Sequence, residues 1–262
     1  MQIRGNTILI TGGGSGIGRA LAEAFHAEGN RVVIAGRRKE LLDEATASNP
    51  GMEGVVLDIA DAESIQGFSA RLKAEYPALN VVIQNAGMMK MESLQGGEVA
   101  DAEATIATNL LGPIRLTAAL LPMLKARPQA TIMTVTSGLA FVPLAMNPTY
   151  CASKAAIHSY TQSLRYQLKD TSVRVLELIP PYVRTELQGP EQAGDPNAMP
   201  LEDFIAETMS ILKNSPDADE ICVERVKAQR FAEANGGYDS FFTKFNDMMF
   251  AARAHRFPEE TR

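Results

Sequence analysis

The sequence contains no tryptophan, two cysteines and three histidines among its 262 residues. Cys151 and Cys222 stand far apart and form no CxxC or CxxxC pair, which disfavours a zinc site, a redox motif and a disulfide framework. Two reduced thiols in a cytoplasmic protein are the simplest interpretation. The histidines, His26, His158 and His255, are too dispersed to predict a metal cluster, and we expect no bound metal.

Long hydrophobic runs and an excess of positive charge are also lacking. The first apolar run, residues 7–11, ends in glycines and has neither the length nor the cleavage site of a signal peptide. No stretch approaches the ~20 apolar residues of a membrane span. With 25 basic and 31 acidic residues the net charge is −6, which disfavours nucleic acid as a partner. We therefore expect a protein that binds neither membranes nor nucleic acid.

What the sequence does contain is a regular alternation of short apolar runs and longer helical patterns over its first 185 residues. The apolar runs are continuous, as in strands buried on both faces of a parallel sheet. The alternation predicts a Rossmann-type doubly wound α/β fold, with about six parallel strands and helices on both faces. The expected strands are residues 7–11, 31–36, 54–58, 81–84, 131–136 and 173–179, and the expected helices are residues 16–29, 39–48, 62–75, 99–126 and 149–169.

The pattern changes after residue 185. Residues 188–200 are rich in Gly, Pro and polar side chains and predict a loop, while Pro113 and Pro122 are expected to bend or break the helix at 99–126. No strand is predicted beyond residue 179. Helices are expected at 201–213, 217–234 and 238–252, so that a helical extension takes the place of a seventh strand.

A glycine-rich loop follows the first predicted strand and precedes the first helix. Gly12, Gly16 and Gly18 form the pattern GxxxGxG. Such a loop lets the chain turn tightly and brings its backbone, and the helix N-terminus, close to a pyrophosphate. No Lys-Ser/Thr pair follows these glycines, which disfavours a P-loop ATPase or GTPase. The loop therefore predicts a dinucleotide site.

The end of the second predicted strand indicates which dinucleotide binds. An NAD enzyme usually has an acidic residue there for the ribose hydroxyls. Here Gly36 is followed by Arg37, Arg38 and Lys39, which could meet a 2′-phosphate. We expect NADP(H) to be preferred, with NAD(H) possible and Arg37 as the main contact. A solvated basic helix start is the alternative interpretation.

A second constellation lies near the middle of the chain. Tyr150 and Lys154 are four residues apart at the start of a predicted helix, which places them on one face. Ser137 lies 13 residues before Tyr150, just after the fifth predicted strand. Each of these residues alone is weak evidence, and the set gains its meaning from the glycine loop that accompanies it.

Together these motifs resemble the short-chain dehydrogenase/reductase superfamily, in the branch with a Tyr-x3-Lys pair and a TGxxxGxG loop, over about residues 5–185. The resemblance implies catalytic roles for Asn109, Ser137, Tyr150 and Lys154. It implies cofactor contacts from Gly12, Ser15, Gly16, Ile17, Gly18, Arg37, Asp58, Ile59, Asn85, Ala86, Gly87, Tyr150, Lys154, Pro180, Val183 and Thr185.

Several of these roles are specific. Asp58 is expected to bond the adenine amine, although such an aspartate alone is more often a strand-end cap. The resemblance implies that Asn109 holds a water of a proton relay, and that Val183 and Thr185 contact the nicotinamide amide and a phosphate. This chain has Pro180-Pro181 where the family usually has Pro-Gly. Because proline cannot take a positive φ, the path beside the nicotinamide is the part of the site that the resemblance predicts least.

The chemistry gives these residue types a physical reason. A tyrosine side chain, whose pKa in water is about 10, is a poor acid or base near pH 7. The ammonium of Lys154 would stabilise the phenolate of Tyr150, and a pKa lowered by ~3 units corresponds to ~4 kcal/mol. Lys154 would also hold the ribose hydroxyls. Ser137 would donate a hydrogen bond to the substrate oxygen.

The expected substrate is a small molecule with a carbonyl or a secondary alcohol. The loops at the carboxyl ends of the strands are mostly apolar and rich in Met, which suggests a medium-sized apolar substrate, although these side chains could equally belong to the core. Residues 188–200 with the helix at 201–213 are expected to form a lid. The apolar positions are Met88, Met89, Met91, Phe141, Val142, Leu144, Met146 and Tyr182.

The tail shows no Gly- and Val-rich seventh strand of the kind usual in the family and instead has a helical pattern at Ile221, Val223, Val226 and Phe231; in that ending it resembles the DltE-like branch. That lack favours a homodimer built on the helices that hold Asn109 and Tyr150. We predict one NAD(P)-binding domain over residues 1–262, with a core at 5–185, a substrate loop at about 186–215 and a helical extension at 216–262.

The resemblance thus implies an NADP(H)-dependent oxidoreductase that transfers a hydride between the nicotinamide and a carbonyl or secondary alcohol. A non-catalytic nucleotide sensor or scaffold with the same fold is the alternative. An epimerase or dehydratase on this fold is disfavoured by the loop form and the chain length.

Overall fold

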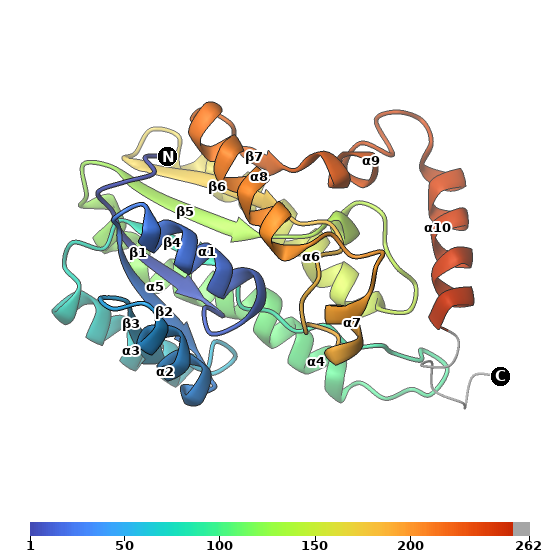
Figure 1. The fold of residues 1–262 in the computed structure, drawn as a ribbon, viewed down its shortest axis with the longest axis horizontal. Helices are drawn as coiled ribbons and strands as arrows, with labels where there is room; N and C mark the ends of the chain where they lie inside the picture. The colour runs from blue at the N-terminus through green and yellow to red at the C-terminus, as the bar shows by residue number, and fades with distance from the viewer. Residues whose placement is uncertain (254–262) are drawn as a thin grey trace.

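A seven-stranded parallel sheet forms the centre of the protein, in the order β3-β2-β1-β4-β5-β6-β7 (Figure 1). The structure is a computed structural model that describes residues 1–253, so that His255 and the rest of 254–262 lie outside the described residues. The strands are β1 (Thr7–Thr11), β2 (Arg31–Gly36), β3 (Glu53–Val56), β4 (Val81–Gln84), β5 (Ala130–Val135), β6 (Val173–Ile179) and β7 (Glu220–Cys222).

The strand order reverses between β1 and β4, and this reversal positions the site. Ile8 of β1 pairs with Val32 of β2 on one side and with Val81 of β4 on the other. The connections from β1 and from β4 then run to opposite faces of the sheet, which opens a crevice at the carboxyl ends of these two strands. Every residue of β1, β4 and β5 is buried, as expected for strands covered on both faces.

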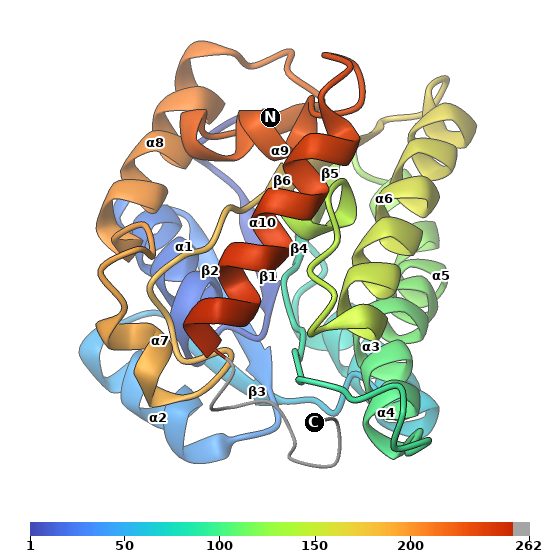
Figure 2. The ribbon, with the colours of Figure 1, turned by 90° about the vertical axis from the view of Figure 1, so that its right-hand side faces the viewer.

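Two layers of helices cover the sheet, as Figure 2 shows from the carboxyl ends of the strands. The apolar faces of α1 (Gly16–Ala27), α2 (Lys39–Ser48) and α8 (Leu201–Asn214) pack into one core cluster. Those of α3 (Ala62–Glu75), α5 (Gly112–Lys125) and α6 (Pro148–Leu168) pack into the other. The doubly wound α/β fold predicted from the sequence is therefore the fold observed.

The prediction of six strands and a purely helical extension is wrong. The segment 217–234 was expected to be a helix, but it contains β7, which extends the sheet beside β6. Ile221 and Val223 are both buried, and their spacing of two is the alternation of a strand. A strand of three residues is too short for its period to stand out against a helical one. Only Glu224–Val226 (a 3-10 turn) and α9 (Lys227–Arg230) are helical within that segment.

The expected helix at 99–126 is continuous rather than broken. It consists of α4 (Ala100–Ile106), a π-helical turn (Ala107–Leu111) and α5. Pro113 lies in the first turn of α5, where a missing N–H costs little, and Pro122 is accommodated inside α5. The run Ala100–Lys125 has the length and apolar composition of a membrane span, and α5 contributes Leu116, Leu120 and Leu124 to the core that it shares with α3 and α6.

Two further helices lie near the carboxyl ends of the strands. The predicted loop at 188–200 contains a short helix, α7 (Pro190–Gly194). The predicted helix at 238–252 is present as α10 (Tyr238–Arg253). In Figure 2, α10 crosses in front of the strand ends, between α7 on one side and α4 and α6 on the other.

Candidate active site

One large cavity of about 1280 Å³ occupies the carboxyl edge of the sheet. Its walls come from the glycine loop after β1, from the segments after β2, β4, β5 and β6, and from α10. Most of the site residues predicted from the sequence line it. Those are Gly12, Ser15, Gly16, Ile17, Arg37, Ile59, Asn85, Ala86, Gly87, Ser137, Tyr150, Lys154, Pro180, Val183 and Thr185.

The glycine loop forms a cradle that excludes side chains. Gly12 and Gly16 have φ angles of 67° and 52°, in the region that favours glycine. A Cβ on Gly18 would lie 2.3 Å from the carbonyl oxygen of Gly12, and one on Gly12 would lie 2.9 Å from the Cα of Ala86. Ser15 caps the N-terminus of α1 without a side-chain bond to it, so the N–H groups of that turn remain for a ligand. These features fit the pyrophosphate of a dinucleotide.

Thr11 and Asn85 tie this loop to the end of β4. The Thr11 hydroxyl accepts hydrogen bonds from the backbone N–H groups of Asn85 and Ala86, both at 3.1 Å. The Asn85 side chain donates to the carbonyls of Thr11 at 3.1 Å and Gly12 at 3.4 Å. Sequence reasoning missed Thr11, whose signal is a polar side chain at the end of an otherwise apolar strand.

The three cations after β2 do not point the same way. Arg37 and Arg38 are exposed and line the cavity, whereas Lys39 forms an ion pair of 2.6 Å with Asp43. The guanidinium of Arg38 donates to the Ser15 hydroxyl at 2.9 Å, which brings its charge against the glycine loop. Sequence reasoning ranked Arg37 first and did not anticipate this contact of Arg38.

Asp58 makes the contacts of a strand-end cap. Its carboxylate accepts a hydrogen bond of 2.9 Å from the N–H of Ala60, and its own N–H donates to the Ser64 hydroxyl at 3.1 Å. Asp58, Gly18 and Asn109 are the predicted site residues that do not line the cavity.

The predicted catalytic side chains meet at the floor of the cavity. The ammonium of Lys154 lies 5.6 Å from the centre of the Tyr150 ring, and both side chains project from the first turns of α6. Tyr150 and Lys154 are only 6% and 5% exposed. Ser137 is the second residue after β5, hydrogen bonds to Tyr150, and accepts a bond of 3.1 Å from the N–H of Leu139.

Burial sets the protonation of this pair. Burial raises the pKa of Tyr150 well above its usual value, and the hydrogen bond with Ser137 opposes the rise. Burial lowers the pKa of Lys154 to about 8, and the negative charge of Glu177 opposes the fall. At neutral pH the site therefore holds a protonated phenol beside an ammonium group.

Asn109 connects two elements that border the site. The π-helical turn carries it, and its amide exchanges two hydrogen bonds with the backbone of Met88, both at 2.9 Å. The amide also donates to the Ser153 hydroxyl at 3.1 Å, and that hydroxyl donates to the carbonyl of Tyr150 at 2.7 Å. Asn109 thus fixes the segment after β4 against α6.

The segment after β6 accommodates its two prolines without a positive φ. The carbonyl of Pro180 accepts a hydrogen bond of 2.9 Å from Gly138, and none of the described non-glycine residues has a positive φ. The buried amide of Gln192, on α7, donates to the Val183 carbonyl at 2.8 Å and the Thr185 hydroxyl at 3.1 Å. Sequence reasoning missed Gln192, which lies in a stretch whose composition suggested only a loop.

The α10 helix forms the outer wall of the cavity. Phe245 and Met249 pack with Tyr150 in one apolar cluster. Asn246 fixes the helix from one side, since its amide oxygen accepts from Ala145 at 2.7 Å and its nitrogen donates to Pro143 at 3.1 Å.

The other end of α10 is fixed by a buried cation. The guanidinium of Arg253 donates to Gln188 at 3.0 Å, lies 3.8 Å from the carboxylate of Asp195, and lies 4.9 Å from the centre of the Tyr182 ring. Sequence reasoning predicted the α10 helix but assigned none of its residues to the site. Apolar residues at 241, 245, 248, 249 and 252, a helical spacing, carried the signal.

Comparisons with known proteins agree with the resemblance drawn from the motifs. The short chain dehydrogenase family matches residues 6–196 of this chain. The uncharacterized oxidoreductase DltE of Bacillus subtilis (strain 168) is 39% identical over 253 residues, which cover 94% of this chain and 98% of that protein.

Solved structures give the same result. A short chain dehydrogenase from Burkholderia cenocepacia J2315, in complex with NADP, superimposes with a TM-score of 0.76 at 27% identity, covering 89% of this chain and 95% of that one. The closed form of a serine dehydrogenase complexed with NADP+ superimposes with a TM-score of 0.72 at 28% identity, covering 78% and 88%. The chain is therefore an oxidoreductase of the short chain dehydrogenase family, with DltE among its relatives.

Proposed function

We propose that this protein transfers a hydride between NADP(H) and a carbonyl or secondary alcohol of an apolar small molecule. The observation that carries the proposal is the meeting of Ser137, Tyr150 and Lys154 in one cavity with the glycine cradle. The similar protein from Burkholderia cenocepacia was solved in complex with NADP, which supports NADP(H) as the cofactor proposed for this chain. From the protein the reaction needs three groups: a proton donor, a positive charge beside it, and a hydrogen-bond donor for the substrate oxygen.

The residues of the cradle would hold the cofactor. The amides at the start of α1 would bind the pyrophosphate, and Arg38, with Arg37 at the rim, would bind the 2′-phosphate that distinguishes NADP from NAD. Val183 and Thr185 would contact the nicotinamide end, and the ribose would lie near Lys154. When bound, the nicotinamide supplies or accepts the hydride.

In the free protein burial raises the pKa of Tyr150, so the lowering that we expected from Lys154 is not observed there. Its phenol keeps its proton at neutral pH and can give it to the substrate oxygen. The ammonium of Lys154 would stabilise the phenolate that remains. Ser137 would hold the substrate oxygen near Tyr150 by a hydrogen bond.

Asn109 would serve the reaction indirectly. Its contacts with Met88 and Ser153 hold the segment after β4 against the first turns of α6. This rigid junction keeps Tyr150 and Lys154 in register with the cofactor site. The water relay that the resemblance implies for Asn109 remains a prediction.

An apolar substrate is favoured by the wall that faces Tyr150. Met89 and Leu144 line it from the loops, and Phe245 and Met249 line it from α10, whereas Met146 of the same cluster is fully buried behind them. Burial of apolar substrate surface against such side chains contributes roughly 25 cal/mol per Å². This wall is closed by α10, whereas the lid predicted at 188–213 contributes α7 and the start of α8 to the rim.

A panel of aldehydes, ketones and secondary alcohols tests the proposal, with NADPH absorbance as the readout. The wild-type protein should turn over apolar members of the panel. Tyr150→Phe should abolish turnover and leave NADPH binding nearly intact. Binding without turnover on the whole panel would instead favour the sensor or scaffold.

Assembly and location remain proposals. We propose a homodimer through the helices that carry Asn109 and Tyr150, on which Leu111 and Tyr166 are exposed. The lack of a seventh strand does not support this dimer, because β7 is present. Light scattering would test the dimer, and cell fractionation would test the predicted cytoplasmic location.

A further inference from the structure

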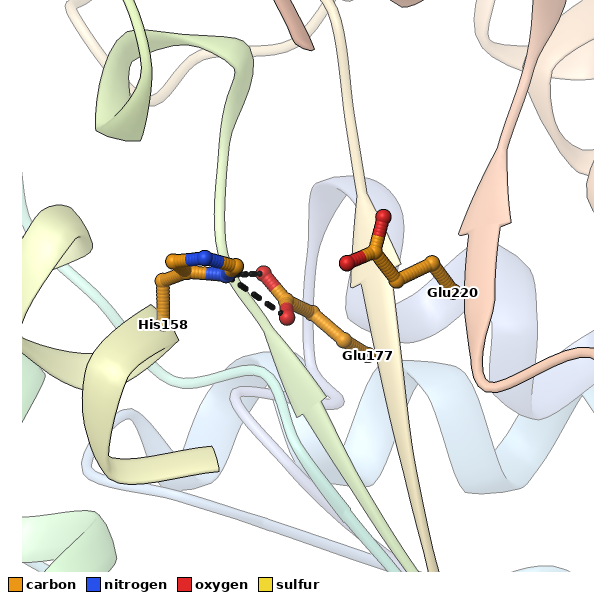
Figure 3. A group of neighbouring side chains, drawn as sticks. All are labelled: His158, Glu177 and Glu220. Atoms are coloured by element: carbon orange, nitrogen blue, oxygen red, sulfur yellow. Dashed lines mark hydrogen bonds and ion pairs between the residues drawn. The ribbon is translucent and has the colours of Figure 1, made fainter. Parts of the chain in front are cut away.

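A cluster of ionisable side chains lies between α6, β6 and β7, on the side of α6 that faces the sheet (Figure 3). The ring nitrogen Nδ1 of His158 lies 2.9 Å from both carboxylate oxygens of Glu177. Glu177 is fully buried and also accepts a hydrogen bond of 2.7 Å from the Thr136 hydroxyl. Glu220 approaches from β7, where it pairs in register with Glu177.

The cluster has the composition of a metal site, but the charge of one of its two carboxylates, Glu220, is already balanced by a cation of the protein. The ligand atoms of His158, Glu177 and Glu220 all lie within 4.8 Å of one another. The guanidinium of Arg230 donates two hydrogen bonds to Glu220, of 2.8 and 2.9 Å, and lies 4.6 Å from the centre of the Phe141 ring. Because Arg230 supplies the cation that Glu220 faces, we assign no metal to this cluster.

The cluster is joined to the candidate active site through two neighbouring residues of the chain. Lys154 donates to the carbonyl of Val135 at 2.8 Å, and Thr136, the next residue, donates to Glu177. Ser137 follows directly. Lys154 and His158 are four residues apart on α6 and so share the face that meets β5 and β6. The buried ammonium and the buried carboxylate are therefore held against the same end of β5.

Burial makes this arrangement energetically significant. A buried ammonium group is unfavourable unless an opposite charge or hydrogen bonds compensate for lost water. The negative charge of Glu177 provides such compensation, since it raises the pKa of Lys154 against the effect of burial. Unlike Glu220, which is paired with Arg230, Glu177 has neutral Thr136 and the His158 ring as its hydrogen-bond partners among the described contacts.

Other ionisable groups also surround Glu177. Cys222 on β7 interacts with its charge, as do His158 from α6 and Glu220 from β7. Arg165 faces Asp219 at 3.8 Å and acts on Glu220. The charges of Arg165 and Arg230 are thus opposed by acids of their own, and Glu177 also acts on Arg230 at longer range.

We propose that Glu177 is a positioning residue for the reaction, whose buried carboxylate keeps Lys154 protonated and whose bond to Thr136 fixes the end of β5 that presents Ser137. The proposal rests on the proposed function for its catalytic meaning. Its electrostatic part concerns the free protein and can be measured without turnover.

The test is a titration of Lys154 by NMR in protein labelled with 13C at the lysine side chains, with Lys154→Met to assign the signal. In Glu177→Gln, the neutral amide still offers Thr136 an acceptor, and the pKa of Lys154 should fall by about one unit or more. The matched control is His158→Gln, which leaves the carboxylate in place and should change that pKa much less. An unchanged pKa in Glu177→Gln, or an equal fall in both variants, would overturn the proposal.

A second variant and a second readout make the test robust. Glu177→Met replaces the buried charge by an apolar side chain of similar size, a change that buried ionic groups often tolerate, and it should give the same fall. In carbonyl reduction, the decline of kcat/KM at alkaline pH should move to lower pH in both Glu177 variants. If the pKa of Lys154 falls in the Glu177 variants but neither they nor the wild type turn over any substrate, only the proposed function is refuted. If the wild type turns over substrate but the pKa of Lys154 does not change in the variants, the role of Glu177 is refuted.

Discussion

Arg38 offers the sharpest test of how this protein would recognise its cofactor. The exposed guanidinium lies at the cavity rim and donates to the Ser15 hydroxyl at 2.9 Å, so a 2′-phosphate bound at this rim would meet both groups. Hydrogen bonds to charged groups contribute about 1.5–3 kcal/mol. Exposure to solvent reduces this value, and we take about 1–2 kcal/mol for Arg38.

At 1.4 kcal/mol per factor of ten, Arg38→Ala should weaken NADPH binding roughly 5- to 30-fold. NADH lacks the phosphate, and its affinity should change less than about twofold on the same grounds. Quenching of nicotinamide fluorescence measures both affinities without any substrate.

Two matched variants separate the cations. Arg37→Ala should weaken NADPH binding as well, but less than Arg38→Ala, because only the Arg38 guanidinium has a contact with the glycine loop among the described hydrogen bonds. Lys39→Ala should have almost no effect, since the Lys39 ammonium is engaged with Asp43. Equal losses for NADPH and NADH in Arg38→Ala, or a loss in Lys39→Ala of the same size, would refute this reasoning.

Three other predictions concern the loop, the floor and the wall of the cavity. Gly18→Ala should lower the melting temperature by roughly 2–10 °C, because overpacking against the Gly12 carbonyl costs about 1–3 kcal/mol. In the control Gly14→Ala, the new Cβ would lie 3.2 Å from Leu41, and the loss of stability should be much smaller. Equal losses by calorimetry would contradict this. Carbonyl reduction at saturating NADPH should decline as the pH rises through about 8, because Lys154 loses its proton there while Tyr150 keeps its own; a rate that stays constant to pH 9.5 would exclude it. Asn246→Ala should accelerate hydrogen exchange in α10 roughly 5- to 150-fold, because the Ala145 N–H and the Pro143 carbonyl lose their partner at a cost of about 1–3 kcal/mol. Unchanged protection of α10 would show that other contacts hold the helix.

The fold was largely predictable because its strands are continuous apolar runs with glycine or polar residues at their ends. Four strands, β1, β2, β4 and β6, have the limits predicted from the sequence. The third strand is two residues shorter at its carboxyl end than predicted, because Leu57 keeps only its N–H bond to Gly36 and Asp58 turns away to cap Ala60. The strand β7 was not predictable from its own pattern, since three residues gain their stability from pairing with β6 rather than from local preference.

The candidate site was predictable where its residues lie at fixed offsets in one motif. Tyr150 and Lys154 share one helix face, and the glycine loop has its pattern within eight residues. The contacts that required the fold were those between distant segments. Arg38 reaches Ser15 across 23 positions, and Asn246 reaches Ala145 across 101, so no local pattern contains either pair.

The C-terminal extension acts on the site from two directions. Its α10 helix supplies Phe245 and Met249 to the wall facing Tyr150. Its β7 strand brings Glu220 beside Glu177, and Arg230, at the end of α9, gives Glu220 a cation of its own. If Glu220 lacked this partner, its charge would add to that of Glu177 and the two carboxylates would repel each other in a buried place. Arg230→Ala should therefore destabilise the cluster of Glu177 and Glu220, while the apolar wall from α10 changes less. The extension thus contributes to the electrostatics of the site as well as to its shape.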